Sequence, residues 1–546
     1  MAQQVSICVH LPPDQVSGLG VPRAPLFPRA PAGREGKLPG QLLLALWLVA
    51  LALRLPGVWL VPNAEGDAYS YAEAIGAMSD KMLQGTFAFA DLFGFWLPLY
   101  QLASALVATI FHLPPVLAGK LVSACCGAGS AVIVFSLTLR VTCSHTVAWI
   151  AFAFLLFDPL HAFLSGLSLT DVPNAFLILA SMHSAVCAHW RRAAIWAALA
   201  ELVRVDSWTL ILVLPALQFL WERRVSPVVI VSLLLAPALW LVMCLVARGD
   251  AFVYFAERAQ YVERYLQFDP ARRRLGLNSI QDVRNLFVGG HLVVFPLALA
   301  ASVWLLVRER SRIFGTSRRS MTWFAPLIIA SYFCAFLGFL TLAYLSRSQP
   351  IIWTRYGLTF LAIGTPLAAW MLYKGWFARD RKSTLRRFAY ASLAVVWAAQ
   401  AVSELKRIVP AAQDDGAHRR IAMALQRIAK AEGWAGASEA SEPRWTPCFC
   451  DDPAVRLLSG LPSHRFLRTE GNENIFSFLD FLYRYQVRYL VFARTEHSLP
   501  VSFCPQLGSK GKAPSPFTLL QSEPSPNHYG PDLWLYRLEL PDAAQR

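Results

Sequence analysis

Long runs of apolar residues, separated by short basic clusters, occupy most of the chain between residues 41 and 403. A helix needs about 18–20 apolar residues to cross the hydrocarbon core of a bilayer. The pattern therefore predicts a polytopic α-helical membrane protein with about eleven transmembrane helices. The predicted spans are residues 41–62, 117–139, 146–168, 172–189, 193–205, 207–221, 226–247, 285–307, 323–345, 350–373 and 388–403.

Three of the apolar segments are too short to cross a bilayer unaided. Residues 193–205 and 207–221 lie on either side of Arg204, and we interpret them as a helical hairpin whose tip lies inside the protein. Residues 96–112 are apolar but end in Leu-Pro-Pro, so we expect an interfacial or re-entrant helix there.

Basic clusters recur at alternate loops, and such clusters remain on the cytoplasmic side of a membrane. Residues 1–40 are rich in Pro, Gly and Arg and lack an apolar core, which predicts a disordered basic cytoplasmic leader and not a signal peptide. The outer side then holds the loop 63–116, the short turn at Thr170–Asp171, the loop 248–284 and the tail from about residue 404. The basic clusters lie before the first span, at Arg140 with His145, at Arg191 with Arg192, at Arg223 with Arg224, and within residues 308–319 and 379–387.

Composition supports the membrane class, since 55% of the residues are hydrophobic and only 16% are charged. A soluble domain is usually about a quarter charged. The net charge of +15 would suggest nucleic acid in a soluble protein. Here the preference of basic clusters for the cytoplasmic side explains much of this positive charge, so we expect no nucleic-acid partner. The run Arg272–Arg274 could meet lipid headgroups or carrier phosphate, but a solvated loop is favoured.

The tail, residues 404–546, has a different pattern and predicts a small α/β domain in the periplasm or lumen. A helix is expected near residues 419–432 and another at residues 475–485. Short apolar runs at 487–494 and 533–540 predict β-strands. In an oxidising compartment, one disulfide could form among the cysteines of this tail, which are Cys448, Cys450 and Cys504.

Two carboxylates at the outer ends of spans are the first candidates for chemistry. Asp67 lies in EGDAYSYAEA, directly after the first span, and shares a helix face with Tyr71 at i+4. The plain alternative for Asp67 is a solvated loop carboxylate. Asp171 lies in LTDVPN, where Thr170 or Asp171 could simply cap the helix that follows.

Charged residues inside apolar stretches are the second group, because they are costly in a membrane and face a cavity or a partner. Arg204 and Asp206 lie in ELVRVDSW, where a purely structural ion pair, Glu201–Arg204 or Arg204–Asp206, is an equal alternative. Arg355, followed by Tyr356, lies near the start of a late span. The plain alternative is that the Arg355 side chain simply extends to the membrane interface.

The order Asp-x-x-x-Tyr-x-x-Ala, a later Gly, a Phe-rich loop and Pro-Leu-Tyr at 98–100 resembles the first outer loop of the GT-C glycosyltransferases. More narrowly, it is similar to the protein O-mannosyltransferase and aminoarabinose transferase group, over residues 41–375. Ala68 replaces a common Glu of that group, and Trp96-Leu97 replaces a common Lys-Pro. The resemblance implies that Asp67 is the essential acid and Asp171 the acid of the second outer loop.

The resemblance also implies a donor sugar on a polyprenyl or dolichyl phosphate and an acceptor that is a protein, lipid or glycan. Asp67 would be the general base, and Arg204 and Arg355 would bind the phosphate. The sequence has no P-loop or Gly-rich nucleotide fingerprint, which agrees with a lipid-borne donor. By ligand type, the two acids could hold Mg²⁺ or Mn²⁺, although nothing requires a cofactor.

Two other functions stay open at this point. A secondary transporter or lipid flippase also uses intramembrane charge, but it usually shows duplicated halves with broken spans, and none is evident. A non-catalytic scaffold would leave Asp67, Arg204 and Arg355 without a purpose. Short cytoplasmic loops favour a bacterial inner membrane over the endoplasmic reticulum.

Overall fold

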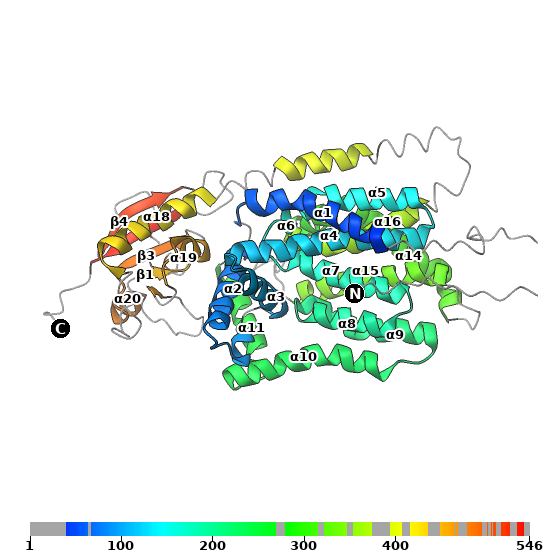
Figure 1. The fold of residues 1–546 in the computed structure, drawn as a ribbon, viewed down its shortest axis with the longest axis horizontal. Helices are drawn as coiled ribbons and strands as arrows, with labels where there is room; N and C mark the ends of the chain where they lie inside the picture. The colour runs from blue at the N-terminus through cyan, green and yellow to red at the C-terminus, as the bar shows by residue number, and fades with distance from the viewer. Residues whose placement is uncertain are drawn as a thin grey trace, which may run out of the picture.

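A computed structural model describes most of the chain, and its helices form a bundle with a small mixed domain at one end (Figure 1). The predicted leader and Arg272–Arg274 lie outside the described residues. Those described are 40–63, 67–94, 96–268, 279–314, 321–346, 353–373, 392, 394–406, 415–434, 448–462, 465–467, 478–493, 500, 504, 506–508, 515–524 and 532–539.

Four helices of the described part are long and apolar enough to cross a membrane: α1 (Gly40–Leu60), α4 (Pro115–Thr142), α10 (Pro227–Arg248) and α15 (Met321–Leu345). Two bent pairs raise the number to six if each pair is one span. The integral-membrane class is supported, whereas the predicted count of eleven spans is not confirmed. The remaining helices of the bundle are α7 (Asp171–Val186), α8 (Trp190–Glu201), α9 (Leu210–Glu222) and α16 (Gly357–Leu372).

The first of the two bent pairs breaks at a residue that ends one helix and caps the next. Helix α5 (His145–Phe157) meets α6 (Pro159–Ser165) at an angle of 58°. Asp158 between them accepts a hydrogen bond from the backbone N–H of His161 at 2.8 Å, and Pro159 occupies the first helical position. Helix α13 (Ser279–Gly289) meets α14 (Val294–Phe314) at 90°.

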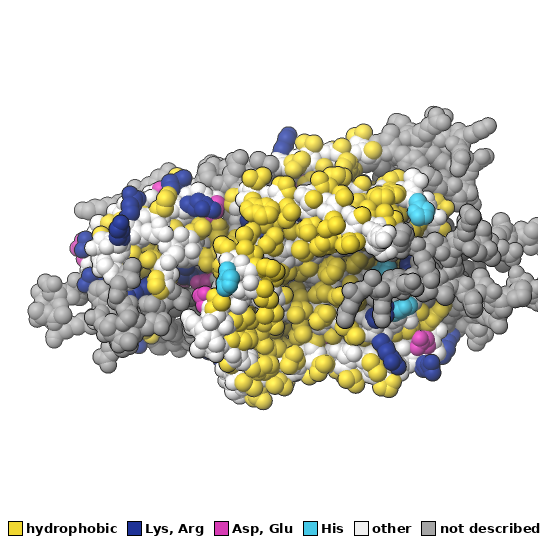
Figure 2. Space-filling view, viewed as in Figure 1, with side chains coloured by type: hydrophobic (Ala, Val, Ile, Leu, Met, Phe, Trp, Pro, Cys, Tyr) yellow, Lys and Arg dark blue, Asp and Glu magenta, His cyan; other side chains and the backbone are white. Residues whose placement is uncertain are grey.

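Small residues let α4 occupy the centre of the bundle. It contacts α1, α3 (Leu99–Phe111), α5, α7 and α16. Gly119, Ala124, Gly127, Ala128 and Ala131 on α4 are all buried, so neighbouring backbones approach closely. Figure 2 shows apolar side chains covering the bundle, while charged side chains gather at the tail and at the opposite end. This distribution is typical of a lipid-facing belt.

The short apolar segments form helices that are too short to cross a bilayer alone. The 3₁₀-helix η2 (Val205–Thr209) joins α8 to α9, so Arg204 lies at the turn of the predicted hairpin. Helix α3 has 13 residues and packs on α2 (Ala68–Leu83) and α4. Its length agrees with the interfacial or re-entrant helix predicted for residues 96–112. The loops predicted to lie on the outer side also contain η1 (Phe89–Leu92) and α11 (Val253–Phe268).

The tail contains the predicted small α/β fold. Its five strands lie in the order β2-β1-β3-β5-β4, parallel from β2 to β3 and antiparallel from β3 to β4. The strands are β1 (Cys448–Cys450), β2 (Phe466–Leu467), β3 (Tyr489–Ala493), β4 (Phe517–Glu523) and β5 (Leu533–Leu538).

Helices cover both faces of this sheet, which explains why β3 is an unbroken apolar run. Helix α18 (Asp415–Ala431) packs with the face that carries Val491, and α20 (Phe478–Arg484) packs with the face that carries Phe492. Helix α19 (Pro453–Ser459) lies beside α18. Cys448, Cys450 and Cys504 are free thiols, so the disulfide considered for the tail is absent from this structure.

Candidate functional site

Asp67 stands where the chain leaves the first helix and begins α2. Its backbone carbonyl accepts the hydrogen bond from the N–H of Tyr71 at 2.9 Å, which starts the helix. Its side chain does not cap α2 and instead accepts a hydrogen bond from Arg355 Nη2 at 2.8 Å. The Asp67 side chain is 45% exposed, whereas Arg355 is 13% exposed. Asp67 is therefore a paired carboxylate that remains open to an incoming molecule.

Tyr71, on the same face of α2, forms the wall beside Asp67. Its hydroxyl shares a hydrogen bond of 3.2 Å with Thr170 Oγ1, and its ring lies 4.5 Å from that of Trp96. Burial, together with the charge of Asp67, raises the pKa of Tyr71 well above the ordinary value. The phenol is therefore a neutral hydrogen-bonding group at physiological pH.

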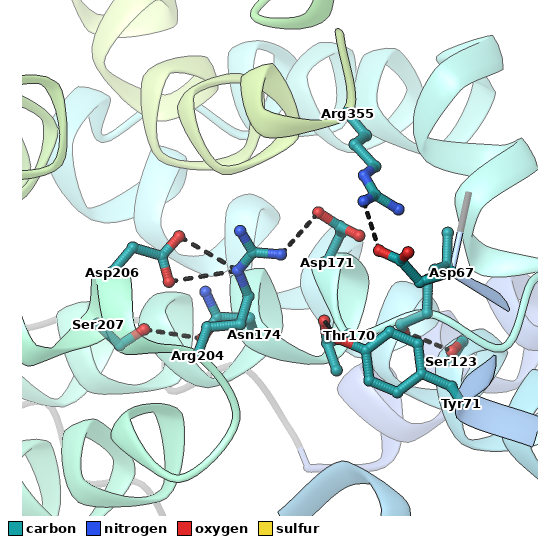
Figure 3. A network of polar contacts seen from close by, with 11 residues as sticks. Asp67, Tyr71, Ser123, Thr170, Asp171, Asn174, Arg204, Asp206, Ser207 and Arg355 are labelled. Carbon is teal, nitrogen blue, oxygen red and sulfur yellow. Dashed lines mark hydrogen bonds and ion pairs between the residues drawn. The ribbon is translucent and has the colours of Figure 1, made fainter. Parts of the chain in front are cut away.

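Asp171 and Asp206 hold Arg204 between them (Figure 3). Arg204 Nη1 lies 3.1 Å from Asp171 Oδ1, and Arg204 Nε lies 3.2 Å from Asp206 Oδ2. Thr170 is the N-cap of α7 and Asp171 its first residue, so the predicted capping role belongs to Thr170, without a side-chain bond. Asp171 is 5% exposed, and a buried carboxylate requires such a partner.

Of the two ion pairs considered for Arg204, the structure contains the one with Asp206. Glu201 is fully buried, and within the described residues its carboxylate oxygens have no hydrogen-bond partner. The 3₁₀ turn after Arg204 returns Asp206 toward the guanidinium, whereas Glu201 is the last residue of α8.

Arg355 and Tyr356 reach the same site from the 3₁₀-helix η3 (Thr354–Tyr356). The Tyr356 ring lies between two cations, with Arg204 at 5.3 Å and Arg355 at 5.8 Å from its centroid. Close backbone contact positions η3, since a Cβ added to Gly289 would lie 1.8 Å from the carbonyl oxygen of Thr354. Only glycine permits this approach between α13 and η3.

A cavity of about 340 Å³ joins these groups, and all seven predicted site residues line it. Among the described residues, its charged lining comprises three carboxylates and three guanidinium groups, because Arg258 of α11 adds to Arg204 and Arg355. Tyr254, Trp96 and Arg258 were not among the predicted residues. The motif around residues 96–100 pointed to Trp96, but no pattern in the loop 248–284 distinguished Arg258 from its other arginines. The predicted residues that line the cavity are Asp67, Tyr71, Asp171, Arg204, Asp206, Arg355 and Tyr356.

The described residues contain no group of three or more His, Cys, Asp or Glu side chains placed to hold a metal ion. Asp67 and Asp171 each bind an arginine in this structure. A divalent cation at these two acids therefore stays a prediction from ligand type.

Comparison with known proteins places this geometry in a family context. Residues 44–205 match the dolichyl-phosphate-mannose-protein mannosyltransferase family. This range contains Asp67, Asp171 and Arg204 and ends before Asp206 and Arg355. No curated protein sequence is significantly similar to the chain.

Two solved membrane enzymes align with most of the chain at low identity. The apo oligosaccharyltransferase of Archaeoglobus fulgidus is 14% identical, with a TM-score of 0.49, over 83% of this chain and 69% of that one. ArnT from Cupriavidus metallidurans in its apo state is 12% identical, with a TM-score of 0.44, over 91% of this chain and 98% of that one. The same ArnT bound to undecaprenyl phosphate is 10% identical, with a TM-score of 0.41. The family match confirms the resemblance predicted from the sequence: residues 44–205 of this chain are related to the dolichyl-phosphate-mannose-protein mannosyltransferases, which are glycosyltransferases.

Proposed function

We propose that the protein transfers a sugar from a polyprenyl-phosphate carrier to an acceptor hydroxyl or amide on the outer side of the membrane. The observation that carries this proposal is the single cavity in which Asp67 and Asp171 face Arg204 and Arg355. A lipid-phosphate donor needs both kinds of group, because one must take a proton from the acceptor and the other must stabilise the departing phosphate.

The walls of the cavity suit a donor with an apolar tail. Phe336, Phe339 and Leu340 of α15 line it together with the arginines. Leu342 and Leu345, one turn further along the same helix, are exposed on the outer surface of the bundle. A prenyl chain could therefore extend along α15 toward lipid while its phosphate stays beside Arg355.

The Asp67–Arg355 pair suggests how the donor prepares the base. The phosphate of the donor would replace the Asp67 carboxylate as the partner of Arg355, since a guanidinium binds phosphate through two parallel hydrogen bonds. Asp67, freed from its cation, would become the stronger base. It would accept the proton of the acceptor as the acceptor attacks the anomeric carbon and the bond from that carbon to the phosphate oxygen breaks.

The other residues would assist without exchanging protons. Arg204, held by Asp171 and Asp206, would stabilise the negative charge that grows on the leaving phosphate. Tyr71 and Trp96 would form an aromatic wall for the sugar ring. The acceptor could be a protein, a lipid or a glycan. The short predicted cytoplasmic loops favour a bacterial inner membrane. A transporter would need the same charges but not a base at the outer end of α1.

The test uses cells that lack the protein and are complemented with the wild type, Asp67→Asn or Asp80→Asn. Asp80 is an exposed residue of the same helix and serves as the control. Loss of a general base slows transfer by about 10²–10⁴-fold, so a polyprenyl-phosphate sugar should accumulate with Asp67→Asn alone, as seen by lipid mass spectrometry. Correctly inserted Asp67→Asn protein that leaves the lipid profile at the wild-type level would refute the proposal.

A further inference from the structure

Helix α2, which begins directly after Asp67, lies between the membrane bundle and the tail domain (Figure 1). Tyr71 on one face of α2 lines the cavity. Tyr69 and Glu73, which are four residues apart on another face, contact the tail. The two contacts join segments more than 340 residues apart in sequence.

The first contact is an ion pair with two hydrogen bonds. Arg456 of α19 donates from Nε to Glu73 Oε1 at 2.9 Å and from Nη2 to Glu73 Oε2 at 2.8 Å. Arg456 is 9% exposed, and its Nη1 also donates to the carbonyl oxygen of Cys450 on β1 at 2.5 Å. A planar fork that is bound on both sides fixes the direction as well as the distance of the contact.

The second contact is a buried hydrogen bond from Tyr69 to Asp415, the first residue of α18. The Tyr69 hydroxyl donates to Asp415 Oδ1 at 2.6 Å, and Arg419 Nη2 lies 2.8 Å from Asp415 Oδ2. Burial, with the charge of Asp415, raises the pKa of Tyr69, so the phenol keeps the proton that it donates. Tyr69 and Asp415 are both at most 5% exposed.

On the tail side of both contacts, α18 and α19 are bonded to each other. Asp452 caps α19 by accepting from the N–H of Val455 at 2.8 Å, and its second oxygen lies 3.5 Å from Nε2 of His418 on α18. Burial alone would raise the pKa of Asp452, but these partners lower it below the ordinary value. Helices α18 and α19, which both contact α2, are therefore also bonded to each other.

We propose that Arg456, Glu73, Tyr69 and Asp415, together the tail clamp, position Asp67 for catalysis. Glu73 lies six residues after Asp67, which is about 9 Å along a helix, so α2 transmits a displacement directly. A shift of about 1 Å in a reacting group can cost about 100-fold in rate. The tail is thus a positioning element of the active site, an inference that rests on the proposed role of Asp67.

The first test measures the position of α2 without any substrate. Ala68 is fully buried beside Asp67, so the thiol of an Ala68→Cys variant should react slowly with a membrane-impermeant maleimide. The rate is read by mass spectrometry on the peptide containing position 68. Adding Arg456→Glu or Glu73→Arg should raise it at least about tenfold, because labelling then requires less local opening. The exchanged pair, Glu73→Arg with Arg456→Glu, should lower the rate again part of the way, because the ion pair forms in reverse but the bond to the Cys450 carbonyl is lost.

The second test measures turnover in the complemented cells described above, without the added thiol. Each single reversal should cause the polyprenyl-phosphate sugar to accumulate, and the exchanged pair should accumulate less of it than either single reversal. Arg420→Glu is the matched control, because Arg420 pairs with Glu523 at 2.6 Å inside the tail and does not reach α2. If the four residues only stabilised the tail, the single reversals would not change the labelling rate at position 68 in the first test, and the exchanged pair would have no effect to reverse there.

The outcomes separate the two proposals. Labelling of position 68 that is unchanged by both reversals would overturn the tail clamp, whatever the activity. Altered labelling with undisturbed turnover would overturn its positioning role. If Asp67→Asn leaves turnover intact, the proposed function is lost, and the labelling result alone decides whether the tail holds α2 in place.

Discussion

Replacing Arg204 by leucine tests how much the arginine contributes to the folded state. The change removes the cation that lies 3.1 Å from Asp171 and 3.2 Å from Asp206. Breaking a buried ion pair by removing one partner costs about 3–5 kcal/mol, because a buried charge is left uncompensated. Asp171 is 5% exposed but Asp206 is 23% exposed, so water compensates one of the two. We expect Arg204→Leu to lower the free energy of unfolding by about 2–3 kcal/mol.

The assay is denaturant unfolding of the full chain in detergent micelles, followed by tryptophan fluorescence. Asp171→Asn added to Arg204→Leu removes the stranded charge and should recover most of the loss, to within about 1 kcal/mol of the wild type. Arg204→Lys keeps the charge but loses the fork that spans two carboxylates, so it should lie between. A double variant that is no more stable than Arg204→Leu alone would refute the reasoning, since the loss would then not come from Asp171.

The remaining predictions concern the backbone beside Arg355 and the acidity of the tail. Gly289→Ala should displace Thr354 and Arg355 and slow turnover about tenfold or more, measured by carrier-sugar accumulation, whereas Gly338→Ala, with open space around its added Cβ, should not. Burial, opposed by nearby Arg456, raises the pKa of Asp451 to about 6, so folding is favoured at acid pH and this benefit disappears as the pH rises through 6. Asp451→Asn should therefore leave tail stability unchanged below about pH 4 and raise it by up to about 3 kcal/mol above pH 6. A thermal-melt series of the full chain from pH 3.5 to 8 checks the sign, and a gain at pH 3.5 would contradict it.

The site could be predicted from sequence because charge is costly in an apolar stretch. Asp171, Arg204 and Arg355 stood out against their surroundings, and the structure places all three around one cavity. Arg258 lay in a loop with many other charges, so nothing marked it. The roles of these residues in the reaction stay predictions.

The span count was harder to predict than the site. Periodicity does not show where a helix bends, and the run 146–168 contains a break at Asp158–Pro159 that divides it into α5 and α6. Two of the five tail strands, β3 and β5, were predicted, because both faces of the sheet are covered there and their sequences are mainly apolar. The Arg456–Glu73 contact joins residues 383 positions apart, and no local pattern in a single sequence can indicate it.

The described lining of the cavity holds as many guanidinium groups as carboxylates, and these fixed cations have a consequence for the end of the reaction. A sugar phosphodiester carries one negative charge, but the bare lipid phosphate left after transfer carries nearly two near neutral pH. Under the proposed function, the lipid phosphate that remains after transfer would bind the fixed arginines more tightly than the sugar-carrying lipid phosphate. Turnover in a living membrane would then be set by how fast other proteins clear and reload that lipid, and purified protein would stall early unless the spent lipid were removed.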